Sequence, residues 1–112
     1  MKRGVSPAFI LILAMLVNTS CLASNEISVS RRAELVSLVR NDCGSCHGLT
    51  LKGGLGPALL PISLQDKAPE GLRETILRGR TATAMPPWDV FMNEAEANWI
   101  VEQLMKGFPN AH

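Results

Sequence analysis

Two cysteines and a histidine stand together in the stretch DCGSCHG, residues 42–48. A Cys-x-x-Cys pair can form a structural zinc site, a redox-active dithiol, a disulfide or a covalent attachment site for haem. A zinc site needs four ligands, and downstream of this motif the chain offers only His112. A redox dithiol of the thioredoxin kind follows a strand in a strand–helix pattern, which this sequence lacks, and a disulfide across so short a loop constrains the unfolded chain little. Haem attachment is therefore the favoured interpretation.

Haem attachment assigns a role to each of the three side chains. The thiols of Cys43 and Cys46 would add to the vinyl groups of one haem, giving a covalent haem c, and His47 would bind the iron from the proximal side. A helical turn explains the spacing, because it sets both sulfurs along one edge of the porphyrin and presents the histidine to one face. The motif thus predicts one covalently bound haem.

The sixth iron ligand has three methionine candidates downstream of the motif, Met85, Met92 and Met105. Methionine would give a closed, high-potential iron suited to electron transfer, whereas an open site would suit ligand binding or peroxide chemistry. Met85 lies in TATAMPPW, residues 81–88, where the prolines forbid a helix and stiffen the loop. Met105 falls in an amphipathic stretch and is expected in the core, and Met92 directly precedes that stretch. We therefore expect Met85 to be the axial ligand, with His112 a poorer choice.

The histidine ligand also needs a partner for its second ring nitrogen. Residues 48–61, GLTLKGGLGPALLP, are rich in glycine, as expected of a chain that passes close to the haem edge. The carbonyl group of Pro57 is a candidate acceptor for the ring N–H of His47, which would fix the ring and raise its basicity. The alternative is that Pro57 serves only as a turn residue.

Three main helices are expected to position these side chains. Residues 30–42 carry apolar side chains at helical spacing and lead directly into the cysteine motif. Residues 69–79 begin with proline and end with glycine, as helices often do. Asn93, with Glu96 three positions later, predicts the start of the last helix, and Gly107 its end. Because no segment alternates apolar and polar residues, the sequence predicts an all-α fold with long loops around the haem.

The apolar stripes of these helices define the expected core. Its members are Leu35, Val36, Leu38, Val39, Leu72, Ile76, Leu77, Ile100, Val101 and Leu104. On the first helix, the charged side chains expected to face solvent are Arg31, Arg32, Glu34 and Arg40. The haem would replace part of the side-chain core that so small a domain lacks.

Residues 1–23 have the three parts of a secretory signal peptide. A basic head precedes an apolar run at residues 8–17, and small side chains follow at Cys21 and Ala23. Ten helical residues span about 15 Å, half of a bilayer core. We expect cleavage near Ala23 and a single cytochrome domain over residues 24–112. An uncleaved anchor and a lipoprotein site at Cys21 are the alternatives.

The length and the charge of the chain limit the number of domains and the classes of function that are possible. A chain of 112 residues allows one domain, and 11 basic against 10 acidic side chains do not supply the basic surface of a nucleic-acid-binding protein. Without the predicted signal peptide, 89 residues remain, with 9 basic and 10 acidic side chains and only two cysteines. The cysteines of the motif thus become a matched pair.

Four stretches carry a resemblance to a known family: residues 42–50 (DCGSCHGLT), 53–59 (GGLGPAL), 84–88 (AMPPW) and 94–101 (EAEANWIV). The chain resembles the small class I monohaem cytochromes c. It is most similar to the small cytochrome c that denitrifying bacteria encode beside cytochrome cd nitrite reductase. The resemblance implies a cytochrome c fold, in which the first and last helices cross near the haem with Trp99 at the crossing.

The same resemblance implies a periplasmic one-electron carrier, not an enzyme, that donates electrons to cytochrome cd nitrite reductase. An accessory role in haem d maturation is one alternative, and an open-site haem enzyme or gas-binding protein is another. We expect a monomer without stable membrane insertion after cleavage, which docks weakly on redox partners. Basic side chains that could steer an acidic partner, or could simply be solvated, are Lys52, Lys67, Arg73, Arg78 and Arg80.

Overall fold

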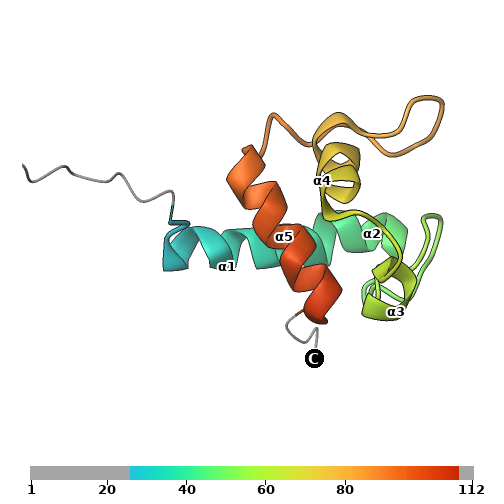
Figure 1. Ribbon diagram of the computed structural model, residues 1–112, viewed down its shortest axis with the longest axis horizontal. Helices are drawn as coiled ribbons and strands as arrows, with labels where there is room; N and C mark the ends of the chain where they lie inside the picture. The colour runs from blue at the N-terminus through green and yellow to red at the C-terminus, as the bar shows by residue number, and fades with distance from the viewer. Residues whose placement is uncertain (1–25, 109–112) are drawn as a thin grey trace, which may run out of the picture.

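A computed structural model describes residues 26–108, so the predicted signal peptide, Cys21 and His112 lie outside the described residues. The helical segments of this range are α1 (Val29–Leu38), η2 (Val39–Cys43), α2 (Gly44–His47), α3 (Pro61–Leu64), α4 (Pro69–Arg78) and α5 (Glu94–Lys106) (Figure 1). The described chain contains no strand, and the predicted all-α fold is confirmed. No helix between residues 26 and 108 combines the length and the apolar character that a membrane span requires.

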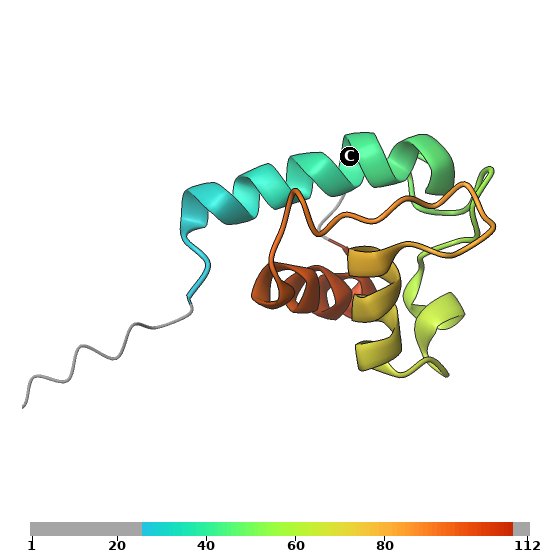
Figure 2. The same cartoon turned by 90° about the horizontal axis from the view of Figure 1, so that it is seen from above.

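The first three segments form one continuous rod (Figure 2). Ser28 caps its start, because the hydroxyl oxygen accepts a hydrogen bond from the main-chain N–H of Arg31 at 3.2 Å. The sequence predicted a helix that ends at Asp42, whereas the rod continues through the cysteine motif to His47. Gly48, with φ of +90°, then ends it.

A π-helical turn, η2, separates α1 from α2 within this rod. The N–H of Gly44 donates to the carbonyl group of Val39, five residues back, as in a π-helix. A π turn holds one residue more than an α turn. The residues that follow it are therefore rotated by about 100° about the helix axis, relative to their positions in an uninterrupted α-helix of the same sequence. Leu35 and Val39, at 0% exposure, belong to the core, and Cys43 packs against its edge.

The helices α4 and α5 begin and end where the sequence predicted. Pro69 occupies the first turn of α4, and Gly79 follows its last residue. At the start of α5, the side chain of Asn93 accepts from the N–H of Glu96 at 3.0 Å. The Glu96 carboxylate in turn accepts from the N–H of Asn93 at 2.9 Å, which completes the predicted capping box. Gly107 follows the last turn.

The short helix α3 was not among the predicted elements. Pro61 opens it, and its four residues are too few to show a hydrophobic period in the sequence. Leu64 of α3 is 3% exposed and lies in the same apolar cluster as Leu104 of α5. Tertiary packing therefore accounts for this helix better than local propensity does.

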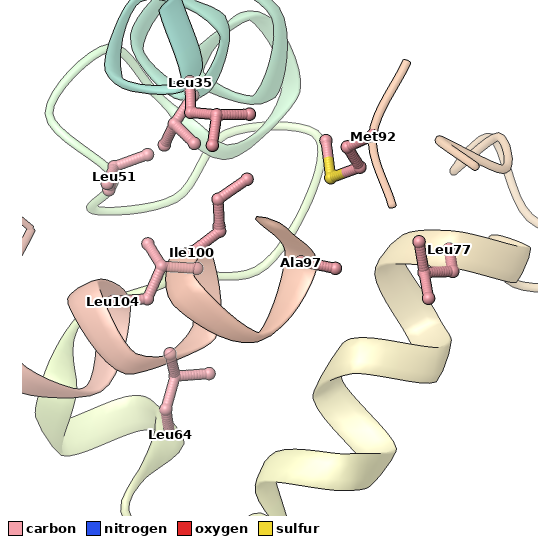
Figure 3. Close-up of a cluster of buried hydrophobic side chains, with 9 residues drawn as sticks. Leu35, Leu51, Leu64, Leu77, Met92, Ala97, Ile100 and Leu104 are labelled. Atoms are coloured by element: carbon pink, nitrogen blue, oxygen red, sulfur yellow. The ribbon is translucent and has the colours of Figure 1, made fainter. Parts of the chain in front are cut away.

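The core lies where α5 meets the rod, α3 and α4 (Figure 3). Its buried members are Leu35, Val39, Leu51, Leu64, Leu77, Met92, Ala97, Ile100 and Leu104. Trp88 and Trp99 are half-buried and pack against this cluster, as do the predicted core residues Leu72 and Ile76. Most of the predicted apolar stripes thus meet in one core, whereas the predicted core residue Val36 is half-buried and lies outside this cluster.

An ion pair ties the start of the rod to the start of α5. Two nitrogens of Arg31, Nε and Nη2, lie 2.6 and 3.2 Å from the two carboxylate oxygens of Glu96. Nη2 also donates to the main-chain carbonyl of Phe91 at 2.6 Å, and Nη1 pairs with Glu34 at 2.8 Å. Hydrogen bonds from Arg31 hold the pKa of Glu96 below its ordinary value. Arg31, which was predicted to face solvent, is partly exposed, and α5 brings a carboxylate to its guanidinium group.

Candidate functional site

The cysteine motif lies at the C-terminal end of the rod. Cys43 is the last residue of η2, and Cys46 and His47 belong to α2, so one stretch of helix carries all three. Both thiols are free, that of Cys46 being exposed and that of Cys43 half-buried. Burial raises the pKa of the Cys43 thiol to about 11, and the negative charge of Asp42 adds to the effect.

The imidazole ring of His47 is fixed by the loop that follows α2. Its Nδ1 lies 2.7 Å from the main-chain carbonyl oxygen of Pro57. Because a carbonyl group only accepts, Nδ1 is the donor in this contact. Gly56 makes the approach sterically feasible, since a Cβ atom there would lie 2.8 Å from both Nδ1 and Cε1 of the ring. The ring nitrogen that remains for a metal is Nε2.

Main-chain hydrogen bonds close this proximal loop, residues 48–59, onto the motif itself. The N–H of Gly53 donates to the carbonyl group of His47 at 2.8 Å, and the N–H of Gly56 donates to that of Cys46, also at 2.8 Å. The last two residues of the motif are thus held through their main chain as well as through the imidazole. Such double support fixes both the position and the rotation of the ring.

The predicted ligand Met85 lies in a second segment, residues 79–92, which we call the distal segment. At its start, Gly79 has φ of +68° and ψ of −169°, a conformation that is essentially restricted to glycine. A Cβ atom at Gly79 would lie 2.6 Å from the carbonyl oxygen of Met85 and 2.7 Å from the carbonyl carbon of Pro86. The N–H of Arg80 donates to the carbonyl oxygen of Met85 at 3.2 Å. The main chain therefore enters the tip of the distal segment at Gly79 and comes back to the same place at Met85.

After the methionine, the distal segment runs back along the end of α4. The N–H groups of Trp88 and Asp89 donate to the carbonyl oxygens of Ile76 and Leu77 at 3.1 and 3.3 Å. These contacts use carbonyl groups that the end of a helix otherwise leaves without a partner. The carboxylate of Asp89 also lies 3.6 Å from the guanidinium group of Arg78. The segment is pinned to α4 at both ends, while residues 80–84 between them are exposed.

The structure separates Met85 from the other two methionine candidates. Met92 is 5% exposed and belongs to the core cluster, and Met105 packs against that cluster. Met85 is half-buried and is not part of the cluster. The side chains of Met92 and Met105 thus serve the core, whereas Met85 stands on a loop outside it.

These donors suit a covalent haem better than a bare metal ion. Among residues 26–108, no group of three or more His, Cys, Asp or Glu side chains could hold a metal ion. Two free thiols can form thioether bonds, and an imidazole with Nδ1 already engaged offers one nitrogen to iron. The proximal loop and the tip of the distal segment project from the same end of the molecule (Figures 1 and 2). The candidate ligands, one from α2 and one from the distal segment, are therefore supplied at one end of the fold.

Two features of the distal segment were not foreseen from the sequence. Gly79 was predicted only to end a helix, and Thr83 was given no role. Thr83 Oγ1 donates to the carbonyl oxygen of Arg80 at 2.7 Å and accepts from the N–H of Met85 at 3.3 Å. The available signal was a threonine two residues before the methionine, since a threonine hydroxyl can bond to the main chain two residues on.

Comparisons with known proteins show which proteins the chain is similar to. The protein family described as cytochrome C oxidase, cbb3-type, subunit III matches residues 31–103. A cytochrome c55X of Pseudomonas aeruginosa is 46% identical over 110 residues, which cover 95% of this chain and 91% of that protein. The dihydro-heme d1 dehydrogenase of the same organism is 41% identical over 73 residues, 65% of this chain and 15% of that protein. The solved structure of the c-type cytochrome NirC matches with a TM-score of 0.71 and 48% identity, over 72% of this chain and 95% of that one.

Proposed function

This chain belongs to the c-type cytochromes, electron carriers with covalently bound haem c, and we propose which of its side chains hold that haem. They are Cys43 and Cys46, through thioether bonds, and His47 and Met85, as axial ligands of the iron. One observation carries the proposal: two free thiols stand beside a histidine whose Nδ1 is engaged by Pro57. The haem supplies the one-electron couple, and the chain supplies its attachment, orientation and ligand field.

On the proximal side, the carbonyl group of Pro57 has two effects on His47. It fixes the tautomer with the proton on Nδ1, and it raises the basicity of Nε2. Because Gly56 and the main chain of the proximal loop hold the ring in place, the histidine would keep one orientation when the oxidation state of a bound haem changes. A ligand that does not move adds little to the reorganisation that accompanies electron transfer.

On the distal side, Met85 would supply the second axial ligand and leave the iron without an open position. The methionine candidates at positions 92 and 105 are engaged in or against the core, which supports this choice. Histidine–methionine ligation raises the reduction potential and leaves no open position for a substrate or a gas. The protein is therefore an electron carrier and not an enzyme in this proposal.

The cellular setting that we propose is the periplasm of a denitrifying bacterium, with cytochrome cd nitrite reductase as the electron acceptor. Support comes from the predicted signal peptide and from the similarity to cytochrome c55X and NirC. Arg73 and Arg78 form ion pairs with Glu74, whereas the exposed Lys52, Lys67 and Arg80 have no ion pair among the described residues. These three are the better candidates to steer a negatively charged partner during weak, transient docking.

The ligand assignment is tested by replacing Met85 with alanine. The ferric protein should lose the methionine-to-iron charge-transfer band at the red edge of the visible spectrum, and the ferrous protein should bind carbon monoxide, which the wild type should not. Met105→Leu is the matched control, because leucine conserves the packing of a side chain that lies against the core. A wild type that binds carbon monoxide readily, or a Met105→Leu variant that loses the band, would contradict the assignment.

The partner is tested by mixing the reduced cytochrome with purified cytochrome cd nitrite reductase in a stopped-flow instrument. We expect single-exponential oxidation whose second-order rate constant falls as salt is added, since exposed charges guide the encounter. Lys52→Glu should lower that rate constant at low salt and have little effect at high salt. No oxidation by the reductase would argue against this partner while leaving the haem ligands unaffected.

The similarity to dihydro-heme d1 dehydrogenase favours a second function, in the maturation of haem d. Deletion of the gene distinguishes the two. An electron donor to the reductase is dispensable for haem d synthesis, so the deletion strain should contain mature haem d and reduce nitrite slowly. Absence of mature haem d from the strain would instead support the maturation role.

A further inference from the structure

The tip of the distal segment, residues 80–85, is closed by hydrogen bonds that converge on one side chain. Thr83 Oγ1 donates to the carbonyl oxygen of Arg80 at 2.7 Å and accepts from the N–H of Met85 at 3.3 Å. The N–H of Thr83 donates to the same carbonyl oxygen of Arg80 at 3.1 Å. The hydroxyl thus links the first and the last residue of the tip.

The rest of the tip has little support. Residues 80–84 are exposed, so no apolar packing holds them. Ala82 has φ of +61°, a left-handed conformation that is strained for a residue other than glycine. Such a turn persists only when bonds around it compensate for the strain, and those bonds are the ones made by Thr83 and by the Arg80–Met85 main-chain pair.

We propose that Thr83 is a positioning residue for the axial methionine: its hydroxyl group holds the main chain of Met85 and thereby keeps the sulfur in place for the iron. The hydrogen bond from the N–H of Met85 restrains the residue one covalent link away from its side chain. The bond to Arg80 anchors the hydroxyl to the start of the segment, where Gly79 fixes the chain against Met85. Loss of the hydroxyl leaves the methionine on an exposed turn that is closed only by two main-chain hydrogen bonds, Arg80 N–H to Met85 and Thr83 N–H to Arg80.

A neighbouring threonine supplies the matched control. Thr81 lies in the same exposed tip, two residues earlier, and its hydroxyl has no hydrogen-bond partner among the described residues. Thr83→Val and Thr81→Val remove the same group from the same turn with the same change in shape. Thr83→Ser keeps the hydroxyl and removes only a methyl group.

The proposal rests on Met85 as the axial ligand, and its test uses the holoprotein. The rate of carbon monoxide binding by the ferrous protein reports how often the methionine leaves the iron. We expect this rate to rise about tenfold in Thr83→Val, because two hydrogen bonds to one hydroxyl together are worth roughly that factor. The charge-transfer band of the ferric variant should weaken in parallel. Thr83→Ser and Thr81→Val should both stay within about twofold of the wild type.

Equal effects of Thr83→Val and Thr81→Val would overturn the proposal, and so would a Thr83→Ser variant that behaves like Thr83→Val. Failure of the ligand assignment has a different signature. In that case the wild type and Met85→Ala would have the same spectrum and the same carbon monoxide binding. The free energy of unfolding, followed by far-ultraviolet circular dichroism in denaturant, should differ little among the threonine variants. The rate of carbon monoxide binding should differ clearly among them.

Discussion

The proximal loop and the distal segment support the two candidate ligands, His47 of α2 and Met85, in different ways. The proximal loop is bonded to the motif along its length, through the main chain of Gly53 and Gly56 and through the carbonyl group of Pro57. The distal segment is fixed at its two ends, at Gly79 and on the last turn of α4, with an exposed tip between them. Support is thus distributed on the histidine side and concentrated on the methionine side.

This difference indicates which ligand can be released without unfolding the protein. His47 could leave its position only if several main-chain hydrogen bonds broke together. Met85 depends on one glycine and a few hydrogen bonds, so a local opening of the distal segment would free it while the helices stay intact. Substitutions on the two sides should therefore separate effects on the methionine from effects on the histidine.

The largest effect is expected from Gly79→Ala. The conformation of Gly79 is strained for alanine, and the added Cβ would meet the main-chain atoms of Met85 and Pro86 at 2.6 and 2.7 Å. Strain and overpacking together should destabilise the holoprotein by about 4 kcal/mol and abolish the methionine charge-transfer band. Denaturant unfolding and the ferric visible spectrum measure the two effects. Retention of the band together with a loss of less than about 1 kcal/mol would show that the distal segment is not fixed at this glycine.

A smaller effect of a different kind is expected from Gly56→Ala. The new methyl group would lie 2.8 Å from the His47 ring, and displacing that ring should cost about 2 kcal/mol. The reduction potential should shift, because the contact between Nδ1 and Pro57 sets the basicity of the ligand. Voltammetry and the visible spectrum are the measurements. The methionine band should survive, and its loss would mean that the two sides are not independently supported.

Replacement of Glu96 by glutamine tests the link between α5 and the distal segment, since Arg31 binds both Glu96 and the carbonyl group of Phe91. We expect a loss of about 1.5 kcal/mol at neutral pH, the contribution of a charge-assisted hydrogen bond. The folded-state pKa of Glu96 lies below its ordinary value of 4.5, so its contribution is complete above that pH and disappears as the pH falls further. Unfolding curves of the two proteins should therefore converge in acid. A constant difference at every pH would contradict the ionic origin of the effect.

The smallest effect, and one of opposite sign, is expected from Gly71→Ala in α4. A Cβ atom at this position would have no neighbour within 4 Å. Because alanine loses less conformational freedom than glycine on entering a helix, the protein should gain about 0.5–1 kcal/mol. The methionine charge-transfer band and the reduction potential should stay at their wild-type values. A change in the methionine band would show that α4 transmits strain into the distal segment, contrary to the independence inferred above.

Local signals in the sequence were sufficient to predict most of the helices and their ends. The capping box of Asn93 and Glu96 and the proline–glycine boundaries of α4 depend on residues within one or two turns, so the structure reproduces them. The cysteine motif is likewise a contiguous helical feature. The contact between His47 and Pro57, ten residues apart, follows from a general requirement of a histidine ligand, and the distance of 2.7 Å is in accord with it.

The features that were not predicted depend on partners distant in the chain or on backbone geometry. Arg31 and Glu96 are 65 residues apart, and neither position signals the other. The helix α3 exists because Leu64 fits into a core that other elements complete. The hydroxyl of Thr83 gains its role from a turn that closes between Arg80 and Met85, which residue types alone do not specify.

The π turn at residues 39–43 holds one residue more than a regular helical turn, and that residue decides where the cysteine motif points. If the turn became α-helical with all five residues retained, the motif would turn by about 100° about the rod, and His47 would no longer face the carbonyl group of Pro57. Deletion of one residue in this turn would let the whole rod become a regular α-helix while the motif kept its direction. A one-residue deletion should therefore be tolerated better here than in the middle of α1, where it would turn the rest of the rod by about 100°.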